Sequence, residues 1–190
     1  RYITNFTVPV AWRRQYCGVF EAHYNGVMFY FIDNEYYFKR SGLYGFYDDA
    51  ERFSFFSRAV MEMLPYVNFH PDLVHCNDWQ TALVPTYYYL FYSHNPWYHN
   101  IKSIFTIHNI QYQGMYGWEV NTECVGIPPA ETRLLEQDGK LNMVKGAIET
   151  ATRVTTVSPS YANEILDPWF SHGLDTILRN RQYKLCGILN

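Results

Sequence analysis

Polar side chains that can bind or activate a substrate follow three short apolar runs of this sequence. The runs are residues 72–76 (DLVHC), 102–107 (KSIFTI) and 153–157 (RVTTV). The polar residues that come after them are Asp78, His108, Asn109, Gln113 and Ser158. A carboxylate, an imidazole and amides that converge on one place can bind a polar substrate and exchange protons with it. The sequence therefore predicts a candidate active site built from these residues.

Three of these residues also have a simpler structural interpretation. Asp78 and Ser158 could each be the N-cap of a following helix, and His108 could be a buried core histidine. His75, Asp78 and His108 include the ligand types of a metal site, but the sequence has no H-E-x-x-H motif and no paired cysteine spacing. It also lacks the G-x-S-x-G, G-x-G-x-x-G and P-loop patterns. We therefore predict no metal site and no phosphate-binding glycine loop.

The elements between the apolar runs predict how the polar residues are positioned. Residues 79–92 and 140–150 have helical patterns, so the order from residue 72 is strand, helix, strand, helix, strand, which is typical of a parallel sheet. Ser158 and Pro159 begin a further helix through Ile165, and a helix near 174–180 and a strand at 185–189 are the last predicted elements. Ligands of such sheets bind at the carboxyl ends of the strands, where the polar residues lie.

The first third of the chain predicts β structure followed by one helix. Residues 16–24 and 27–32 are strand-like and flank Asn25-Gly26, which favours a type I′ turn, and the residues before them alternate as a strand does. We expect a loop over 36–47 and then a helix over 49–64. This helix would have Asp48 as N-cap with Glu51 as its capping-box partner, and it would end at Pro65. Its apolar face would consist of Phe53, Phe56, Val60, Met63 and Leu64.

Composition excludes several classes of function. The 190 residues fit one domain. Their net charge of −3 offers no basic surface for nucleic acid or an acidic membrane. No apolar stretch is long enough to cross a bilayer. The four cysteines are widely spaced, which indicates a reducing cytoplasm. Aromatic residues make up 19% of the chain, and tyrosine is the most frequent of them. Such side chains suit sugar-binding or protein-binding surfaces.

At HCNDW (75–79), FTIHNIQYQG (105–114) and VTTVSPSYANEI (154–165), the sequence resembles the bacterial glycogen synthases and plant starch synthases. The resemblance covers essentially the whole chain. It implies a Rossmann-like N-terminal lobe of the two-lobed glycosyltransferase B fold, an α/β domain with a mainly parallel sheet, helices on both faces and an N-terminal β-hairpin. It also implies that residues 1–190 are a single incomplete acceptor-side domain, which lacks its first strand and the C-terminal lobe and is inactive alone.

The activity that the resemblance implies is transfer of glucose from ADP-glucose to the non-reducing end of an α-1,4-glucan with retention of configuration and without a cofactor. His108 is similar to the family's active-site histidine, and Asp78 to an aspartate that binds sugar hydroxyls. The residues similar to its substrate-binding groups are Asn109, Trp79, Tyr44, Tyr112, Gln113 and Gly114. The segment 120–140 departs from the usual family pattern.

Two alternatives remain open from the sequence. One is a relative that uses UDP-glucose or works as a phosphorylase, and the other is a non-catalytic glucan-binding module whose tyrosines stack on sugar rings. A parallel sheet without its usual central first strand would also expose a strand edge, so we expect the chain to self-associate.

Overall fold

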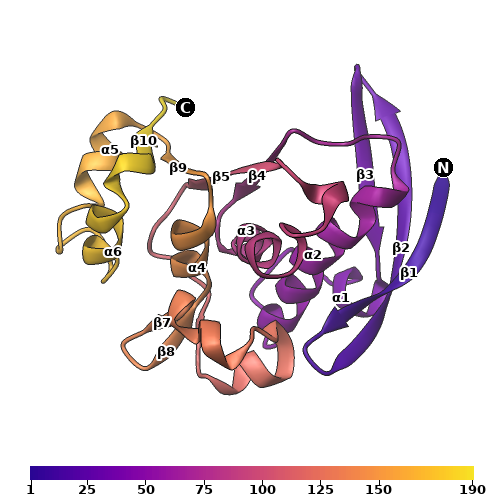
Figure 1. The fold of residues 1–190 in the computed structure, drawn as a ribbon, viewed down its shortest axis with the longest axis horizontal. Helices are drawn as coiled ribbons and strands as arrows, with labels where there is room; N and C mark the ends of the chain where they lie inside the picture. Colours follow the sequence, from indigo (N-terminus) through magenta and orange to yellow (C-terminus); the bar gives the residue numbers. More distant parts are fainter.

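The computed structural model describes residues 1–190 and contains three sheets (Figure 1). The first is antiparallel, in the order β1-β2-β3, and consists of β1 (Tyr2–Val10), β2 (Arg13–Tyr24) and β3 (Val27–Asp33). Asn25 and Gly26 connect β2 and β3 with φ angles of 48° and 79°, as a type I′ turn requires. The predicted hairpin is confirmed, and β1 extends it to three strands.

The predicted loop over 36–47 is wrong at its beginning, where α1 (Glu35–Phe38) forms a single turn. The side chain of Asn34 accepts a hydrogen bond from the Tyr37 amide and caps this turn. An isolated turn of four residues has too short an apolar pattern to be recognised in the sequence. After α1 the chain runs without regular structure as far as Tyr47.

The helix α2 (Asp49–Met63) has the predicted position, but its predicted capping box is wrong. Asp48 makes no side-chain cap bond, because its carboxylate binds the Arg40 guanidinium at 2.7 Å. Glu51 accepts from the Tyr37 hydroxyl and not from the Asp48 amide. The single apolar face is also incomplete, because α2 is buried on several sides, with Phe56 and Val60 only half-buried.

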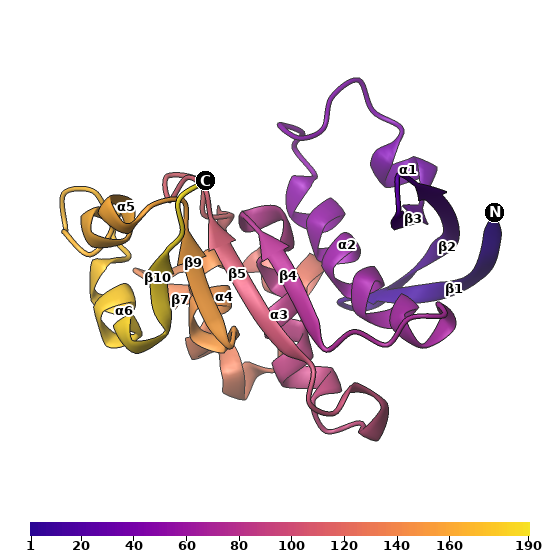
Figure 2. The ribbon, with the colours of Figure 1, turned by 90° about the horizontal axis from the view of Figure 1, so that it is seen from above.

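The second sheet is parallel, in the order β10-β9-β5-β4 (Figure 2). It contains β4 (Leu73–Asn77), β5 (Lys102–Ile107), β9 (Arg153–Thr156) and β10 (Leu185–Gly187). The three strands that we predicted from the first apolar runs pair in register, with Cys76 beside Phe105 and Phe105 beside Val154. Their carboxyl ends lie along one edge of the sheet, which we call the rim.

The α/β class with a parallel sheet is confirmed, but the expected helices on both faces of that sheet are not found, because its two crossover helices lie on the same face. Successive strands are added in a single direction, so right-handed crossovers place α3 (Leu83–Tyr87) and α4 (Met143–Thr150) on the same side. Figure 2 shows the opposite face toward the viewer, with these helices behind it. β4 is an edge strand, and Leu73 is 46% exposed, so the first apolar run is not buried along its whole length.

Two further helix predictions need correction. Residues 79–92 form no continuous α-helix: a 3₁₀ turn (Trp79–Thr81) precedes α3, and a π-helical turn (Tyr88–Tyr92) follows it. The helix expected from residue 140 begins at Met143. Residues Lys140–Asn142 form β8, which pairs with β6 (Met115–Tyr116) and β7 (Glu136–Gln137) in a small third sheet.

The last helices agree with the sequence. α5 (Pro159–Glu164) and α6 (Asp175–Asn180) lie where we predicted helices, beside the β10 edge of the parallel sheet (Figure 1). The remaining short helical turns are Leu64–Tyr66, Pro96–Tyr98, Asn121–Val125, Pro129–Leu134 and Gln182–Lys184. No helix of the structure combines the length and the apolar character needed to span a bilayer.

Two apolar cores hold these layers together, and α2 separates them. The larger core lies between the parallel sheet and α3 and α4, and it includes Phe105, Ile107 and Leu83. The smaller core lies between α2 and the antiparallel sheet, and it includes Val8 and Phe55. Each such side chain contributes roughly 1.5–3 kcal/mol when it is fully buried. The loops at the rim are therefore attached to strands and helices that the two cores hold rigidly.

Candidate active site

A backbone-to-carboxylate contact joins the loop after β4 to the loop after β5. The Asp78 Oδ1 atom accepts a hydrogen bond from the His108 amide at 2.9 Å, and the Asp78 amide donates to the Thr106 carbonyl at 3.0 Å. Asp78 occupies the N-cap position of the turn Trp79–Thr81 but makes no side-chain cap bond. The interpretation of Asp78 as a simple helix cap is therefore wrong.

Asp78 also has an unusual backbone conformation. Its φ of 57° and ψ of −179° lie in a region that is essentially restricted to glycine, and a non-glycine residue there costs about 1–3 kcal/mol. The two hydrogen bonds to β5 and its following loop hold Asp78 in this conformation. Strain of this kind is concentrated at functional sites, where the surrounding structure fixes it.

A cleft of about 490 Å³ opens beside Asp78 at the rim. The predicted site residues that line it are Tyr44, Asp78, Trp79, Asn109 and Tyr112. Its other lining residues are Gly45, Asp49 and Gln80. The rings of Tyr44 and Tyr112 are 65% and 59% exposed, so both can contact a ligand. A carboxylate, an amide and exposed rings in a cleft of this size suit a polyhydroxylated ligand.

Trp79 forms one wall of the cleft, and neighbouring aromatic rings hold its indole in place. Its ring packs edge-on against Phe53 with centroids 5.0 Å apart, and Tyr116 lies 6.2 Å away. Gly114, at φ 61°, approaches so closely that a Cβ atom there would lie 2.8 Å from Trp79 Cε3. Gly114 therefore shapes the site by having no side chain.

His108 joins the cleft through its backbone, whereas its ring points elsewhere. The Nε2 atom lies 3.0 Å from Asn77 Oδ1, and the ring lines a second cavity of about 290 Å³ on the open face of the sheet. Because the His108 side chain is exposed, the interpretation of it as a core histidine is wrong. The role of the imidazole stays a prediction.

Asn109 and Gln113 organise the loop that follows. The Asn109 Oδ1 atom accepts from the Gln111 amide at 3.0 Å, which closes a tight turn. Gln113 is 4% exposed and lies beneath the loop, where its amide donates to the carbonyls of Ile110 and His172. The fully buried Asn142 donates to Gln113 Oε1 at 2.6 Å. Gln113 is thus a positioning residue in this structure, because protein groups occupy its amide.

The sequence did not identify the pair that holds the loop carrying Tyr44. Asp49 accepts hydrogen bonds from the amides of Gly45 and Phe46 and binds Arg52 at 2.5 Å. Arg52 is 2% exposed, and it also donates to the carbonyls of Tyr37 and Leu43. The adjacent aspartates 48 and 49 at a helix start were the available signal, and we assigned the capping role to Asp48.

The other expectations at the rim concern Ser158 and a metal. Ser158 is a helix start, because its hydroxyl accepts from the Tyr161 amide at 3.0 Å and caps α5. The set His75, Asp78 and His108 does not form a metal-binding group, and the structure has no cluster of three or more side chains that could hold a metal ion. His75 binds the Thr106 hydroxyl at 2.7 Å instead.

Comparison with known proteins places this arrangement in a family. The family model described as the starch synthase catalytic domain matches residues 1–180. The glycogen synthases of Desulforamulus reducens and Desulfitobacterium hafniense are 46% and 48% identical to the chain, each over 99% of it. These alignments cover 40% and 41% of the two relatives, so the chain spans about two fifths of their length.

A solved structure agrees in both fold and sequence. The catalytic domain of starch synthase IV from Arabidopsis thaliana, bound to ADP and acarbose, superposes with a TM-score of 0.88 and 32% sequence identity. The match covers 100% of this chain and 40% of that one. Two of the segments that carry the resemblance, 75–79 and 105–114, supply four of the eight residues that line the cleft beside Asp78. The chain belongs to the starch synthase catalytic domain family.

Proposed function

We propose that residues 1–190 form the acceptor-side lobe of a longer glucosyltransferase. The intact enzyme would transfer glucose from ADP-glucose to the non-reducing end of an α-1,4-glucan with retention of configuration. The contact between Asp78 and the His108 amide carries this proposal, because it fixes the backbone of His108 beside a cleft with sugar-binding groups. The Arabidopsis relative, which bound ADP and acarbose, supports the nucleotide and the glucan as ligand classes.

In the proposed reaction, the bond between the glucose C1 and the ADP oxygen breaks, and a bond from C1 to the acceptor 4-hydroxyl forms on the same face of the sugar. The acceptor proton moves to the departing phosphate oxygen. Positive charge develops at C1, and the His108 carbonyl dipole stabilises it from a fixed position. Asp78 and Asn109 bind sugar hydroxyls, and Trp79, Tyr44 and Tyr112 enclose the ring.

The lobe alone would be catalytically inactive in this proposal, because the nucleotide would be held mainly by the remaining part of the enzyme. The reaction needs no cofactor, since the donor sugar already carries its leaving group. We place the enzyme in the cytoplasm, where its four cysteines, all of them free thiols in the structure, would remain reduced.

The test is an assay of the intact enzyme with ADP-glucose and UDP-glucose and a maltooligosaccharide acceptor. We expect ADP release with ADP-glucose and at most a small rate with UDP-glucose. Asp78→Asn should lower kcat by about 10²–10³, the usual effect of removing a preorganised electrostatic group. Asp72→Asn, an exposed aspartate just before β4, is the matched control. Full activity of Asp78→Asn would contradict the assigned role, and faster transfer from UDP-glucose would contradict the donor.

A further inference from the structure

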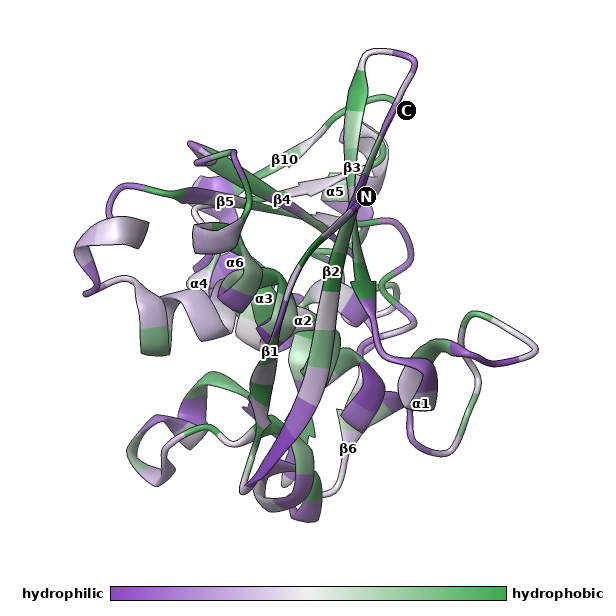
Figure 3. Cartoon of the chain, turned by 90° about the vertical axis from the view of Figure 1, so that its right-hand side faces the viewer, coloured by the Kyte–Doolittle hydropathy of each residue, from purple (hydrophilic) through white to green (hydrophobic).

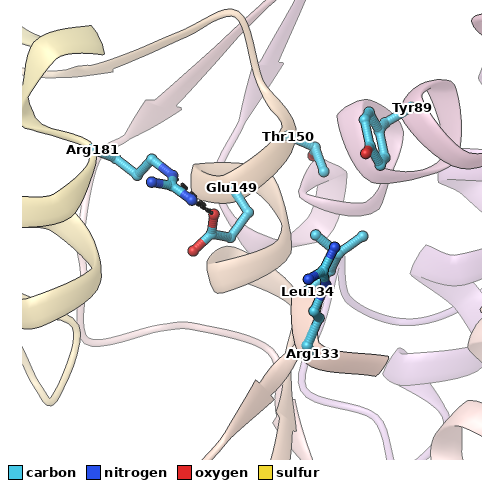
Figure 4. A pocket seen from close by; sticks show the side chains of 6 residues that line it. All are labelled: Tyr89, Arg133, Leu134, Glu149, Thr150 and Arg181. Atoms are coloured by element: carbon cyan, nitrogen blue, oxygen red, sulfur yellow. Dashed lines mark hydrogen bonds and ion pairs between the residues drawn. The ribbon is translucent and has the colours of Figure 1, made fainter. Parts of the chain in front are cut away.

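Another cleft, separate from the two cavities described above, lies away from the rim at the carboxyl-terminal end of α4. It has a volume of about 410 Å³, and its lining residues are Tyr89, Arg133, Leu134, Glu149, Thr150 and Arg181 (Figure 4). None of these residues lines the cleft beside Asp78. The proposed glucosyl transfer makes no use of them, so their arrangement needs a separate explanation.

Two arginines with different environments define this cleft. Arg181 is held by Glu149, whose Oε2 atom accepts from its Nε at 2.9 Å and from its second terminal nitrogen at 2.6 Å. Figure 4 shows this contact as dashed lines and shows Arg133 extending toward Glu149 and Thr150. The Arg133 guanidinium makes no hydrogen bond or ion pair in the structure and is free to bind a ligand.

Two lysines near the cleft are bound by backbone carbonyls. The Lys145 ammonium binds the backbone carbonyls of Arg133 and Glu136 and forms no ion pair. Lys184 is 5% exposed. Its ammonium donates to the carbonyls of Glu149 and Ala151 and so provides hydrogen-bond partners for carbonyl groups at the carboxyl-terminal end of α4. Burial, and then the charge of Arg181, lower the pKa of Lys184 to about 8.

Glu149 is the single carboxylate among the lining residues, and Arg181 neutralises it. Among the lining residues, Arg133 then remains as the one charged group without a partner. This local positive charge contrasts with the chain's net charge of −3. A chain that is acidic overall therefore presents an unpaired guanidinium in a concave place, which favours the binding of a small anion.

We propose that this cleft binds the phosphate group of a small phosphate monoester. The Arg133 guanidinium presents a free planar fork that matches phosphate oxygens, whereas Glu149 occupies the fork of Arg181. The Thr150 hydroxyl, which donates to the Gly146 carbonyl, can still accept a hydrogen bond from a protonated phosphate. The Tyr89 ring, 49% exposed, forms a wall against which the organic part of the ligand can lie. The volume exceeds what a bare phosphate needs and falls within the range of small-ligand sites.

The experiment measures binding to the purified protein by calorimetry in a phosphate-free buffer. The probes are inorganic phosphate, ribose 5-phosphate and ribose. Arg133→Gln removes one guanidinium that has no partner in the fold, so this variant should fold normally. Arg14→Gln, an exposed arginine of β2 with no side-chain partner, removes the same charge elsewhere. Neither variant touches the cleft beside Asp78, so the result is independent of glucosyl transfer.

We expect both phosphate probes to bind the unmodified protein and the Arg14→Gln variant equally well, with ribose 5-phosphate tighter than inorganic phosphate. Arg133→Gln should weaken both phosphate probes about tenfold or more, which corresponds to the loss of one charge-assisted contact. Equal weakening in Arg14→Gln would overturn the proposal, because the effect would then be one of net charge. Binding of ribose as tight as that of ribose 5-phosphate would also overturn it, and so would an absence of phosphate binding at millimolar concentrations.

Discussion

The carboxylate of Asp78 accepts the backbone amide of His108 at 2.9 Å from a conformation that favours glycine, with φ at 57°. The contact fixes the two loops relative to each other at the cost of local strain. Replacement of Asp78 therefore changes stability and activity in different ways, depending on which residue takes its place.

We predict that Asp78→Gly is more stable than Asp78→Ala by about 1 kcal/mol, because both lose the carboxylate but only glycine relieves the strain. Both variants should lose transfer activity alike in the intact enzyme. Urea unfolding of the two proteins measures the difference. Equal stabilities would mean that the Asp78 backbone is not strained.

The close approach of Gly114 to Trp79 predicts a second difference. Gly114→Ala adds a Cβ atom 2.8 Å from Trp79 Cε3 at a positive φ, so it should cost about 2–4 kcal/mol and displace the indole. Gly139→Ala is the matched control, because Gly139 has a φ of 76° and no atom within 4 Å of an added Cβ. That variant should cost only about 1 kcal/mol and leave tryptophan fluorescence unchanged. If the two variants lose equal stability, the contact with Trp79 is unimportant.

The buried pair of Arg52 and Asp49 predicts a strong effect at the loop that carries Tyr44. Arg52→Met leaves Asp49 without its cation and should cost about 3–5 kcal/mol in the free energy of unfolding. Arg52→Lys should recover little of this loss, since a lysine cannot reproduce the fork that reaches Asp49 and two carbonyls. Thermal unfolding with limited proteolysis would detect both the lost stability and a loosened loop at 39–47. If Arg52→Lys kept full stability, a positive charge beside Asp49 would be sufficient and the guanidinium fork would not be needed.

Lys184 predicts a specific dependence of stability on pH. Its folded-state pKa of about 8 lies below the ordinary value of 10.5, so the unfolded chain binds more protons between these values. The penalty from charged Lys184 is fully present below pH 8, and it is relieved as the pH rises toward 10.5. We expect the stability of the unmodified protein relative to Lys184→Met to rise by up to about 3 kcal/mol over this range.

The comparison with Lys184→Met is necessary because other groups titrate in the same range. Burial raises the pKa of Cys17 and Cys76 to about 12, which favours the protonated thiols in the folded state and lowers stability at alkaline pH in both proteins. Subtraction of the two pH profiles cancels these contributions. A flat difference between pH 7 and 10 would show that Lys184 is not perturbed.

The open edge of β4 predicts self-association of residues 1–190. Beside this edge lies a largely apolar groove of about 620 Å³, lined by β3 (Val27, Met28), α2 (Val60, Met63) and β4 (Leu73, Val74). Figure 3 shows hydrophobic colour along β3 at its upper end. A second copy can pair with the free backbone groups and cover the groove. Light scattering should show dimers at high micromolar concentration, and Leu73→Lys should restore monomers. A monomeric unmodified chain would contradict this expectation.

Periodic elements with a recognisable turn could be predicted from the sequence, and they include the β2–β3 hairpin, α2 and the three central strands. Asp78 and Asn109 of the cleft were also predicted, since parallel strands bring their carboxyl ends to one edge, whereas Tyr44, Trp79 and Tyr112 came from the family resemblance. The burial of each strand could not be predicted, because it depends on which strand lies at the sheet edge. The β7–β8 hairpin was missed although Asp138-Gly139 favours a turn, because its two strands have only two and three residues. The direction of the His108 ring depends on Asn77, a residue of the 75–79 motif to which the sequence assigned no role.

The buried amides around Asn142 have a consequence for how the protein opens. Asn142 donates to both Gln113 and Gln137, and those two side chains donate in turn to the carbonyls of His172 and Gly173. Breaking any one of these bonds leaves a buried polar group without a partner, so partial separation is unfavourable. The loop beside the cleft, the β7–β8 hairpin and the segment before α6 should therefore exchange their amide hydrogens as one cooperative unit, although they are far apart along the chain.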